Sequence, residues 1–179
     1  MWYVVHTAIG GEESAIEQCK IALGDVAKRF ILPKCQFTRR YHSEYKMIEK
    51  VTFPGYFFIV SDEPKELEEL LMRIPSVAEP VRIDGGFHPI KKEEEEILQR
   101  MMDEDDLIRA SIGNLIDGKL IVEEGPLKGL EDKVKKFNRH DRWANLEVEL
   151  FEDCGMMKVG LEIKARLTEE EYLDKKKVG

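Results

Sequence analysis

Hydrophobic residues recur with two different periods in the first hundred positions of the chain. Runs rich in aromatic and β-branched residues predict strands, whereas apolar residues three or four positions apart predict helices. The predicted strands cover residues 2–6, 30–37, 53–60 and 79–83, and the predicted helices cover residues 12–23, 63–74 and 91–102. This order predicts an α+β sandwich, an antiparallel sheet covered by helices.

Three details of this region carry separate expectations. Residues 39–50 are basic and polar, which predicts the tip of a hairpin or a mobile loop. Pro54 and Gly55 lie inside the strongest apolar run, which favours an edge strand or a bulge at that point. Asp62 is placed to cap the second helix.

The pattern changes at residue 118. Leu120 and Val122 alternate with Lys119, Ile121 and Glu123. Turns at Gly125-Pro126 and at Gly129 then interrupt the extended pattern twice before the next apolar positions. Strict alternation returns over residues 144–150 and 161–166. Short strands separated by turns predict a small all-β barrel. The charged tail, residues 168–179, is either a helix or frayed.

These patterns divide the chain into three parts. Residues 1–103 form the α+β domain, residues 104–117 a connector, and residues 118–179 the barrel with its charged tail. The connector begins with an acidic run but carries five large aliphatic residues, which predicts that it is partly docked rather than free.

The composition excludes several classes of protein. A hydrophobic fraction of 42% excludes wholesale disorder. The chain has neither an apolar run of about 18 residues nor a basic segment followed by an apolar one, so we expect a cytoplasmic protein and no membrane partner. The three cysteines, Cys19, Cys35 and Cys154, lack CxxC spacing and are expected to be reduced, buried or inert.

No pattern of catalytic chemistry is present in the sequence. The histidines and cysteines show no ligand spacing, and the chain has no Gly-rich phosphate loop and no nucleophile elbow. We therefore expect no enzyme activity, no catalytic residue, no metal site and no cofactor.

Charge is distributed unevenly along the chain. The net charge is −8, of which residues 1–117 contribute −7 with 15 basic and 22 acidic residues. Residues 118–179 are close to neutral, and within them five basic residues fall inside residues 133–142 beside one acid, Asp141. This local basic patch is typical of a nucleic-acid contact.

Three motifs together resemble the NusG family of transcription elongation factors. Trp2-Tyr3-Val4-Val5 resembles the start of the family's NGN domain, Phe53-Pro54-Gly55-Tyr56 resembles its FPGY strand, and residues 118–134 resemble its KOW motif. They occur in the family's order across almost the whole chain. The resemblance implies an NGN domain of α+β type joined to a small, SH3-like all-β KOW barrel.

The connector and the start of the KOW motif resemble specialised NusG paralogues called LoaP. Those paralogues are antitermination factors of long biosynthetic operons that recognise an RNA hairpin in the leader. A departure also separates this chain from general NusG: Glu152 and Asp153 stand at the barrel tip through which NusG contacts the termination factor Rho and a ribosomal protein. A second departure is Asp132, where the motif often has Gly and where Asp is expected to tolerate positive φ.

The resemblance implies two binding sites and a monomeric protein that acts by binding alone. RNA polymerase, through its clamp helices, is expected to bind an aromatic surface formed by Trp2, Phe53 and Tyr56. A hairpin in the nascent leader RNA is expected to bind Lys and Arg side chains of the barrel, with His140 as a further hydrogen-bond donor. The RNA-contact candidates are Lys128, Lys133, Lys135, Lys136, Arg139, His140, Arg142, Lys164 and Arg166.

Several alternatives stay open from the sequence alone. The aromatic residues are also typical of a core, and the basic residues of a solvated polar face. Arg39, Arg40 and Lys46 would contact polymerase or upstream DNA, although a solvated hairpin is the simpler reading. The alternative function is a general elongation factor whose barrel recruits protein partners. A helical, autoinhibited barrel is a further alternative, and the period-2 alternation over residues 119–166 argues against it.

Overall fold

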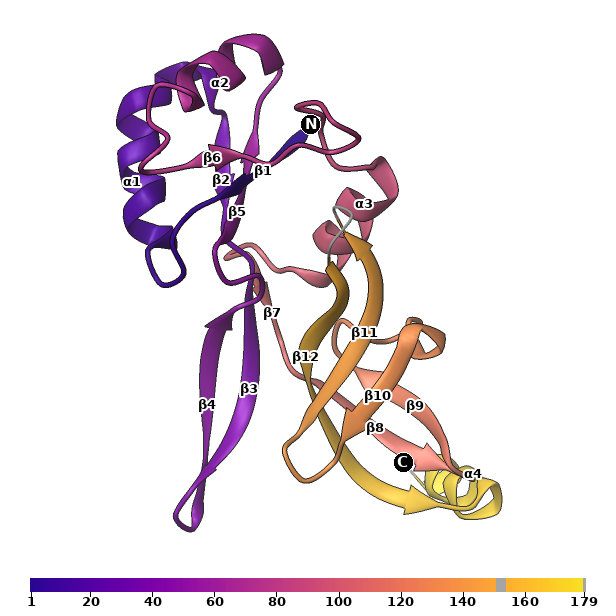
Figure 1. Ribbon diagram of the computed structural model, residues 1–179. Helices are drawn as coiled ribbons and strands as arrows, with labels where there is room; N and C mark the ends of the chain where they lie inside the picture. The colour runs from indigo at the N-terminus through magenta and orange to yellow at the C-terminus, as the bar shows by residue number, and fades with distance from the viewer. Residues whose placement is uncertain (151–153, 179) are drawn as a thin grey trace. The chain divides into compact units, whose positions relative to one another are not determined.

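A computed structural model describes residues 1–150 and 154–178 (Figure 1). The chain forms two compact units. The first contains Met1–Pro33 and Val51–Gln99, and the second contains Lys34–Lys50, Arg100–Val148 and the segment that begins at Met156. Residues 34–50 therefore leave the first unit as an excursion and belong to the second, which the sequence pattern does not indicate.

The first unit is built on a four-stranded sheet in the order β2-β5-β1-β6. These strands are β1 (Trp2–His6), β2 (Arg29–Ile31), β5 (Tyr56–Val60) and β6 (Glu79–Pro80). All their pairings are antiparallel, and β1 and β5 pair along their full length, with Val4 opposite Phe58. The structure thus confirms the predicted antiparallel sheet with helices.

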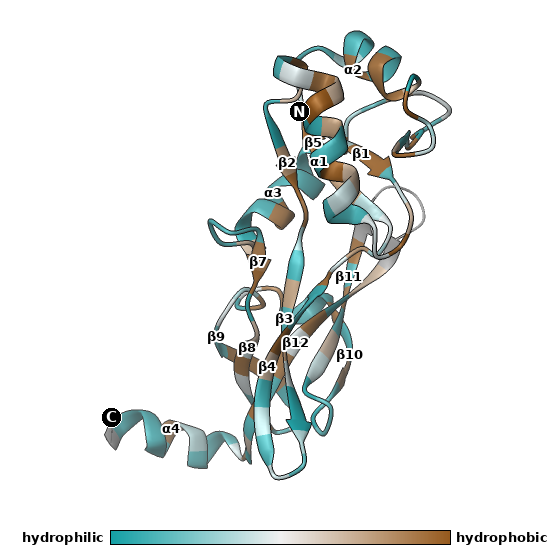
Figure 2. Ribbon diagram, turned by 90° about the vertical axis from the view of Figure 1, so that its left-hand side faces the viewer, coloured by the Kyte–Doolittle hydropathy of each residue, from teal (hydrophilic) through white to brown (hydrophobic). Residues whose placement is uncertain are grey.

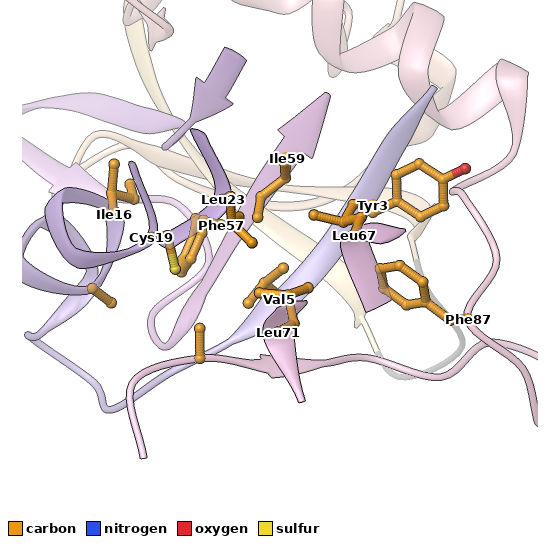
Figure 3. Close-up of a cluster of buried hydrophobic side chains, with 12 residues drawn as sticks. Tyr3, Val5, Ile16, Cys19, Leu23, Phe57, Ile59, Leu67, Leu71 and Phe87 are labelled. Atoms are coloured by element: carbon orange, nitrogen blue, oxygen red, sulfur yellow. The ribbon is translucent and has the colours of Figure 1, made fainter. Parts of the chain in front are cut away.

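Helices α1 (Glu12–Leu23) and α2 (Pro64–Leu71) cover one face of this sheet. Their apolar residues pack in one buried cluster with alternate residues of β1 and β5 (Figure 3). The labelled members of this cluster are Tyr3, Val5, Ile16, Cys19, Leu23, Phe57, Ile59, Leu67, Leu71 and Phe87. A short 3-10 helix, η1 (Gly24–Val26), follows α1, and α3 (Lys92–Met101) ends the α+β segment of the chain.

Two local predictions for this unit are wrong. Pro54 and Gly55 lie in neither an edge strand nor a bulge, because β5 begins after them at Tyr56 and is paired on both sides. Gly55 has φ +84°, so it forms the turn that leads into a central strand. Asp62 does not cap α2: the capping position is Glu63, without a side-chain cap, and Asp62 forms an ion pair with Lys28.

The turn before β5 is fixed by a buried carboxylate. The Gly55 N–H donates to Glu12 Oε1 at 2.7 Å, and the Gly55 carbonyl accepts from the Thr7 N–H at 2.8 Å. Burial by itself would raise the pKa of Glu12, but hydrogen bonds from backbone amides, that of Gly55 first among them, bring this pKa below its ordinary value. A charged Glu12 therefore ties the first turn of α1 to the chain entering β5.

Residues 39–50 form a regular hairpin and not a mobile loop. Strands β3 (Lys34–Tyr41) and β4 (Glu44–Val51) are eight residues each, and β3 also pairs in parallel with β7 (Leu107–Ile108). His42 lies at the turn with φ +55°. The hairpin, one of the two expectations for this stretch, is confirmed, whereas the extent of its strands does not follow from the sequence, because residues 39–50 are mostly exposed and carry no apolar alternation.

The second unit also holds a five-stranded sheet in the order β10-β11-β12-β8-β9. This all-β sheet domain is consistent with a KOW fold. Its strands are β8 (Ser111–Ile116), β9 (Lys119–Glu124), β10 (Val134–Asn138), β11 (Trp143–Leu150) and β12 (Cys154–Leu167). β8 lies within residues 104–117, where we placed a connector, and pairs with both β9 and β12.

The two glycine turns after β9 are present as expected. Gly125 and Gly129 have φ +99° and +79°, and the buried Ser111 hydroxyl accepts the Leu127 N–H at 3.0 Å between them. Asp132 does not need positive φ, because it lies inside a short 3-10 helix, η2 (Glu131–Lys133). The chain then enters β10 directly.

The charged tail forms a helix, α4 (Glu169–Val178), most of whose residues are hydrophilic (Figure 2). Its start is a capping box: the Glu171 N–H donates to Thr168 Oγ1 at 3.2 Å, and the Thr168 N–H donates to Glu171 Oε2 at 2.8 Å. Across the described residues, no helix is long and apolar enough to cross a membrane.

Cys19 and Cys35 are buried and not joined in a disulfide, and burial raises the pKa of Cys19 to about 11. The side chains of Leu150 and Cys154, and residues 151–153 entirely, lie outside the described part of the structure. The departure predicted at Glu152 and Asp153 therefore falls outside the described residues.

Candidate nucleic-acid interface

A cleft of about 500 Å³ opens in the second unit where the β3–β4 hairpin meets β11, β12 and the turn that joins β10 to β11. Four of its lining side chains are cationic, one is acidic and three are aromatic. The lining residues are Phe37, Thr38, Arg39, Arg40, Tyr45, Lys50, His140, Asp141, Trp143 and Lys158.

A glycine allows the hairpin and the barrel to approach this closely. A Cβ added at Gly160 of β12 would lie 2.3 Å from the Gln36 carbonyl oxygen and 2.9 Å from the Ala110 Cβ. No other residue fits this position without a shift of backbone. Gln36 is itself buried, and Arg39 and Arg40, which follow on the same strand, are exposed at the cleft.

The turn between β10 and β11 is held by its own side chains. Asn138 Oδ1 accepts the backbone N–H groups of His140 and Asp141 at 2.9 Å each, and Asn138 Nδ2 donates to Asp141 Oδ2 at 2.9 Å. This Asx-type turn leaves Arg139 and His140 exposed.

Arg142, at the end of that turn, links the barrel to the hairpin. Its guanidinium donates to Glu162 Oε2 at 3.0 Å and lies 3.8 Å from the centroid of the Tyr45 ring on β4. The Arg142 side chain is only 20% exposed. Glu162 neutralises the charge of Arg142, and the Tyr45 ring covers its guanidinium. Arg142 is therefore expected to bind a phosphate less strongly than an unpaired arginine would.

The other predicted RNA contacts fall at several places. On β10, Lys135 forms an ion pair with Glu147 at 2.7 Å, whereas Lys136 is exposed and forms no ion pair with any described residue. Lys128 lies exposed in the glycine turn, and Lys133 is half-buried in η2. Lys164 and Arg166 are exposed on the second half of β12. Of the nine predicted residues, His140 is the one that lines the cleft.

Among the residues lining the cleft that sequence reasoning missed are Tyr45, Lys50, Trp143 and Lys158. Lys158 Nζ lies 4.3 Å from the centroid of the Trp143 ring. Alternation on β12, where Met157 and Val159 are buried, was a signal that Lys158 faces outward. No local pattern shows that residues 37–50 meet residues 140–158.

The three predicted polymerase contacts share one face of the first unit's sheet. Trp2 and Tyr56 alternate with the core residues of β1 and β5, so they lie on the face opposite α1 and α2. Phe58 joins them: its ring centroid lies 5.7 Å from that of Trp2 and 6.1 Å from that of Phe53. Trp2 and Phe53 are only 5% and 4% exposed, whereas Tyr56 is partly exposed beside His6.

The comparisons with known proteins agree with this architecture. The family model described as "Transcription termination factor nusG" matches residues 1–101. Among solved structures, one described as "Domain interaction in Thermotoga maritima NusG" superposes with a TM-score of 0.53 at 20% identity, covering 90% of this chain and 93% of that one. A search of curated protein sequences finds no significant match. The family match covers more than half of the chain, and the structural likeness supports the fold.

Proposed function

Because the chain belongs to the NusG family of transcription factors, we propose that it is a specialised member of the LoaP type, which promotes readthrough of terminators in long operons. In this proposal the first unit binds the clamp helices of RNA polymerase, and the second unit binds a hairpin in the nascent leader RNA. The chain acts by holding these two partners together and catalyses no reaction.

The polymerase contact is supported by the aromatic sheet face. Aromatic anchors on one face are typical of protein interfaces. Tyr56 is partly exposed there, so it is the first residue to test, with Trp2 and Phe53 beneath the same face as supporting residues. Capture of purified RNA polymerase by the full chain should weaken in Tyr56→Ala and persist in Tyr41→Ala, which removes an exposed tyrosine of the hairpin.

The RNA contact is supported by one observation above all. The exposed cations of β10 and of its turn are followed directly by His140, which lines a cleft that contains further cations. Lys136 and Arg139 are exposed and His140 lines the cleft, in a chain whose net charge is −8. RNA duplexes are recognised mainly through phosphates and 2′-hydroxyls, which such side chains contact well. A local basic surface on an acidic protein indicates a specific anionic partner rather than general coating of nucleic acid.

In vitro transcription through a terminator, with and without an upstream leader hairpin, tests this function. The proposal predicts that the chain raises readthrough only when the hairpin is transcribed. Readthrough that rises equally on both templates would instead identify a general elongation factor, whose barrel recruits proteins.

A further inference from the structure

We propose that the cleft between the β3–β4 hairpin and the barrel binds an unpaired nucleotide of the RNA, with a base against the aromatic side chains and phosphates on the hairpin arginines. This inference rests on the proposed RNA binding and adds to it a second contact of different chemistry. The stem of a hairpin would contact Lys136 and Arg139, and its loop would reach the cleft.

The charge of the cleft favours a phosphate ligand. Arg39, Arg40, Lys50 and Lys158 face one carboxylate, Asp141, which leaves an excess of three positive charges when His140 is neutral. In the part of the chain that the structure describes, Arg39, Arg40 and Lys50 form no ion pair. The Asp141 carboxylate already accepts a hydrogen bond from Asn138 Nδ2. These cations are therefore available to an external anion.

The aromatic side chains favour a base in addition to a phosphate. Trp143 is half-buried and Tyr45 is 53% exposed, and each already has a cation on its ring. Unpaired bases stack on aromatic rings and on arginine planes, and such stacking contributes to the affinity of single-strand-binding proteins. The cleft volume of about 500 Å³ falls within the range of small-ligand sites.

A paired base does not suit this cleft. In a duplex the faces of the bases are covered by their neighbours, so aromatic rings find no surface to stack on. A hairpin loop offers uncovered bases next to a duplex stem. The turn between β10 and β11 suits that arrangement, because Arg139 is exposed on it and the adjacent His140 lines the cleft.

The cleft walls are held in place without a ligand. Close packing of Gly160 against Gln36 fixes β12 to β3, and Arg142 bridges Glu162 and Tyr45. A preformed site loses less conformational entropy on binding than a mobile one. The two walls come from segments about a hundred residues apart, so neither the hairpin nor the barrel carries the site alone.

Fluorescence anisotropy of the full-length chain with three labelled probes tests the inference: the oligonucleotide U12, a 12-base-pair RNA duplex and dT12. The cleft variants are Arg39→Glu/Arg40→Glu and Trp143→Ala, with Trp143→Phe as the conservative variant. The charge-matched control is Lys65→Glu/Arg73→Glu, at two exposed positions of the first unit. Thermal unfolding of each variant checks that it is folded.

The inference predicts that U12 affinity falls at least tenfold in Arg39→Glu/Arg40→Glu and less than twofold in the control. Trp143→Ala should weaken U12 about fivefold or more, within the range for loss of one stacked base, while Trp143→Phe retains most of the affinity. The slope of log K against log salt should become shallower by about 1.4 in the double variant, because each phosphate contact to a single strand contributes about 0.7.

Three results would overturn the inference. If the duplex binds but U12 does not, or if U12 binds equally well to the cleft variants, the nucleotide site is refuted and the proposed RNA contact still stands. Failure of both RNA probes to bind would remove the proposed RNA contact as well. Tighter binding of dT12 than of U12 through the same residues would assign the cleft to a DNA strand and not to RNA.

Discussion

The guanidinium of Arg142 lies 3.8 Å from the centroid of the Tyr45 ring. One residue belongs to the barrel and the other to a hairpin excursion that is almost a hundred residues earlier in the chain. Together with Gly160 and Gln36, this pair joins the two walls of the basic cleft. The cleft, and with it the proposed nucleotide site, depends on this junction.

Tyr45→Ala should loosen the hairpin from the barrel. A cation–π contact at an exposed site contributes about 0.5–1 kcal/mol, so we expect a small loss of global stability. The larger effect should be local: faster amide hydrogen exchange over β4 (Glu44–Val51). Tyr41→Ala, on the same hairpin and also exposed, is the matched control. Equal exchange in the two variants would contradict a role for the Arg142 contact.

Glu12 should make folding stability depend on pH in acid. Its pKa is lowered in the folded chain from a reference value of 4.5. A carboxylate with a depressed folded pKa stabilises the fold above its unfolded pKa, and this contribution is lost as pH falls through the folded value. Glu12→Gln should therefore destabilise at neutral pH by about 2 kcal/mol, the scale of a hydrogen bond to a charged group.

Urea unfolding of this variant between neutral and acidic pH measures the effect. The difference from the parent chain should begin to shrink as pH falls below about 4.5, where Glu12 becomes protonated in the unfolded chain, and should be lost once pH falls below the lower pKa of the folded chain. Glu17→Gln, which removes a largely exposed carboxylate from the same helix, is the control. A pH-independent difference for Glu12→Gln would show that the charge of Glu12 is not what fixes the Gly55 turn.

Ser111→Ala should destabilise the second unit. The buried Ser111 hydroxyl accepts the Leu127 N–H, and Leu127 is itself fully buried. Leaving that N–H without a partner costs about 1–3 kcal/mol. Ser43→Ala, at the exposed turn of the hairpin, is the comparison. Urea denaturation of both variants measures the difference, and indistinguishable midpoints would contradict the account of this turn.

Lys136 should contribute more to RNA affinity than its neighbour Lys135. Both are exposed on β10, but the charge of Lys135 is neutralised by an ion pair in which its Nζ lies 2.7 Å from Glu147 Oε2. Gel-shift titration of the full chain with leader hairpins should show a larger loss for Lys136→Gln than for Lys135→Gln. The Lys136 variant should also reduce the salt slope by about 0.7–0.9, the value for one phosphate contact. The reverse order would place the RNA on a different face.

Much of the fold followed from local pattern. The residues of β1 and α1 were predicted at their observed bounds, and the glycine turns before β10 were found because only a few residue types adopt positive φ. The hairpin tip was expected, but the full length of β3 and β4 was not, because most of residues 39–50 are exposed and so lack an apolar alternation.

The candidate site was less accessible to sequence reasoning. A cluster of basic residues within ten positions singled out the segment that forms β10 and the following turn, because charge density is a local property. Trp143 and Lys158 were not found, since their role depends on Arg39 and Tyr45 lying beside them. Nor does the sequence distinguish Lys136 from Lys135, because the partner carboxylate of Lys135 is on another strand.

Terminator readthrough on a template with a leader hairpin tests the central claim most directly, comparing the parent chain with Lys136→Gln/Arg139→Gln. The hairpin is first selected by gel shift, and a template without it serves as reference. The account predicts that the parent chain raises readthrough only on the hairpin template and that the double variant loses this gain. Equal readthrough on both templates, or a double variant as active as the parent, would contradict recruitment through RNA.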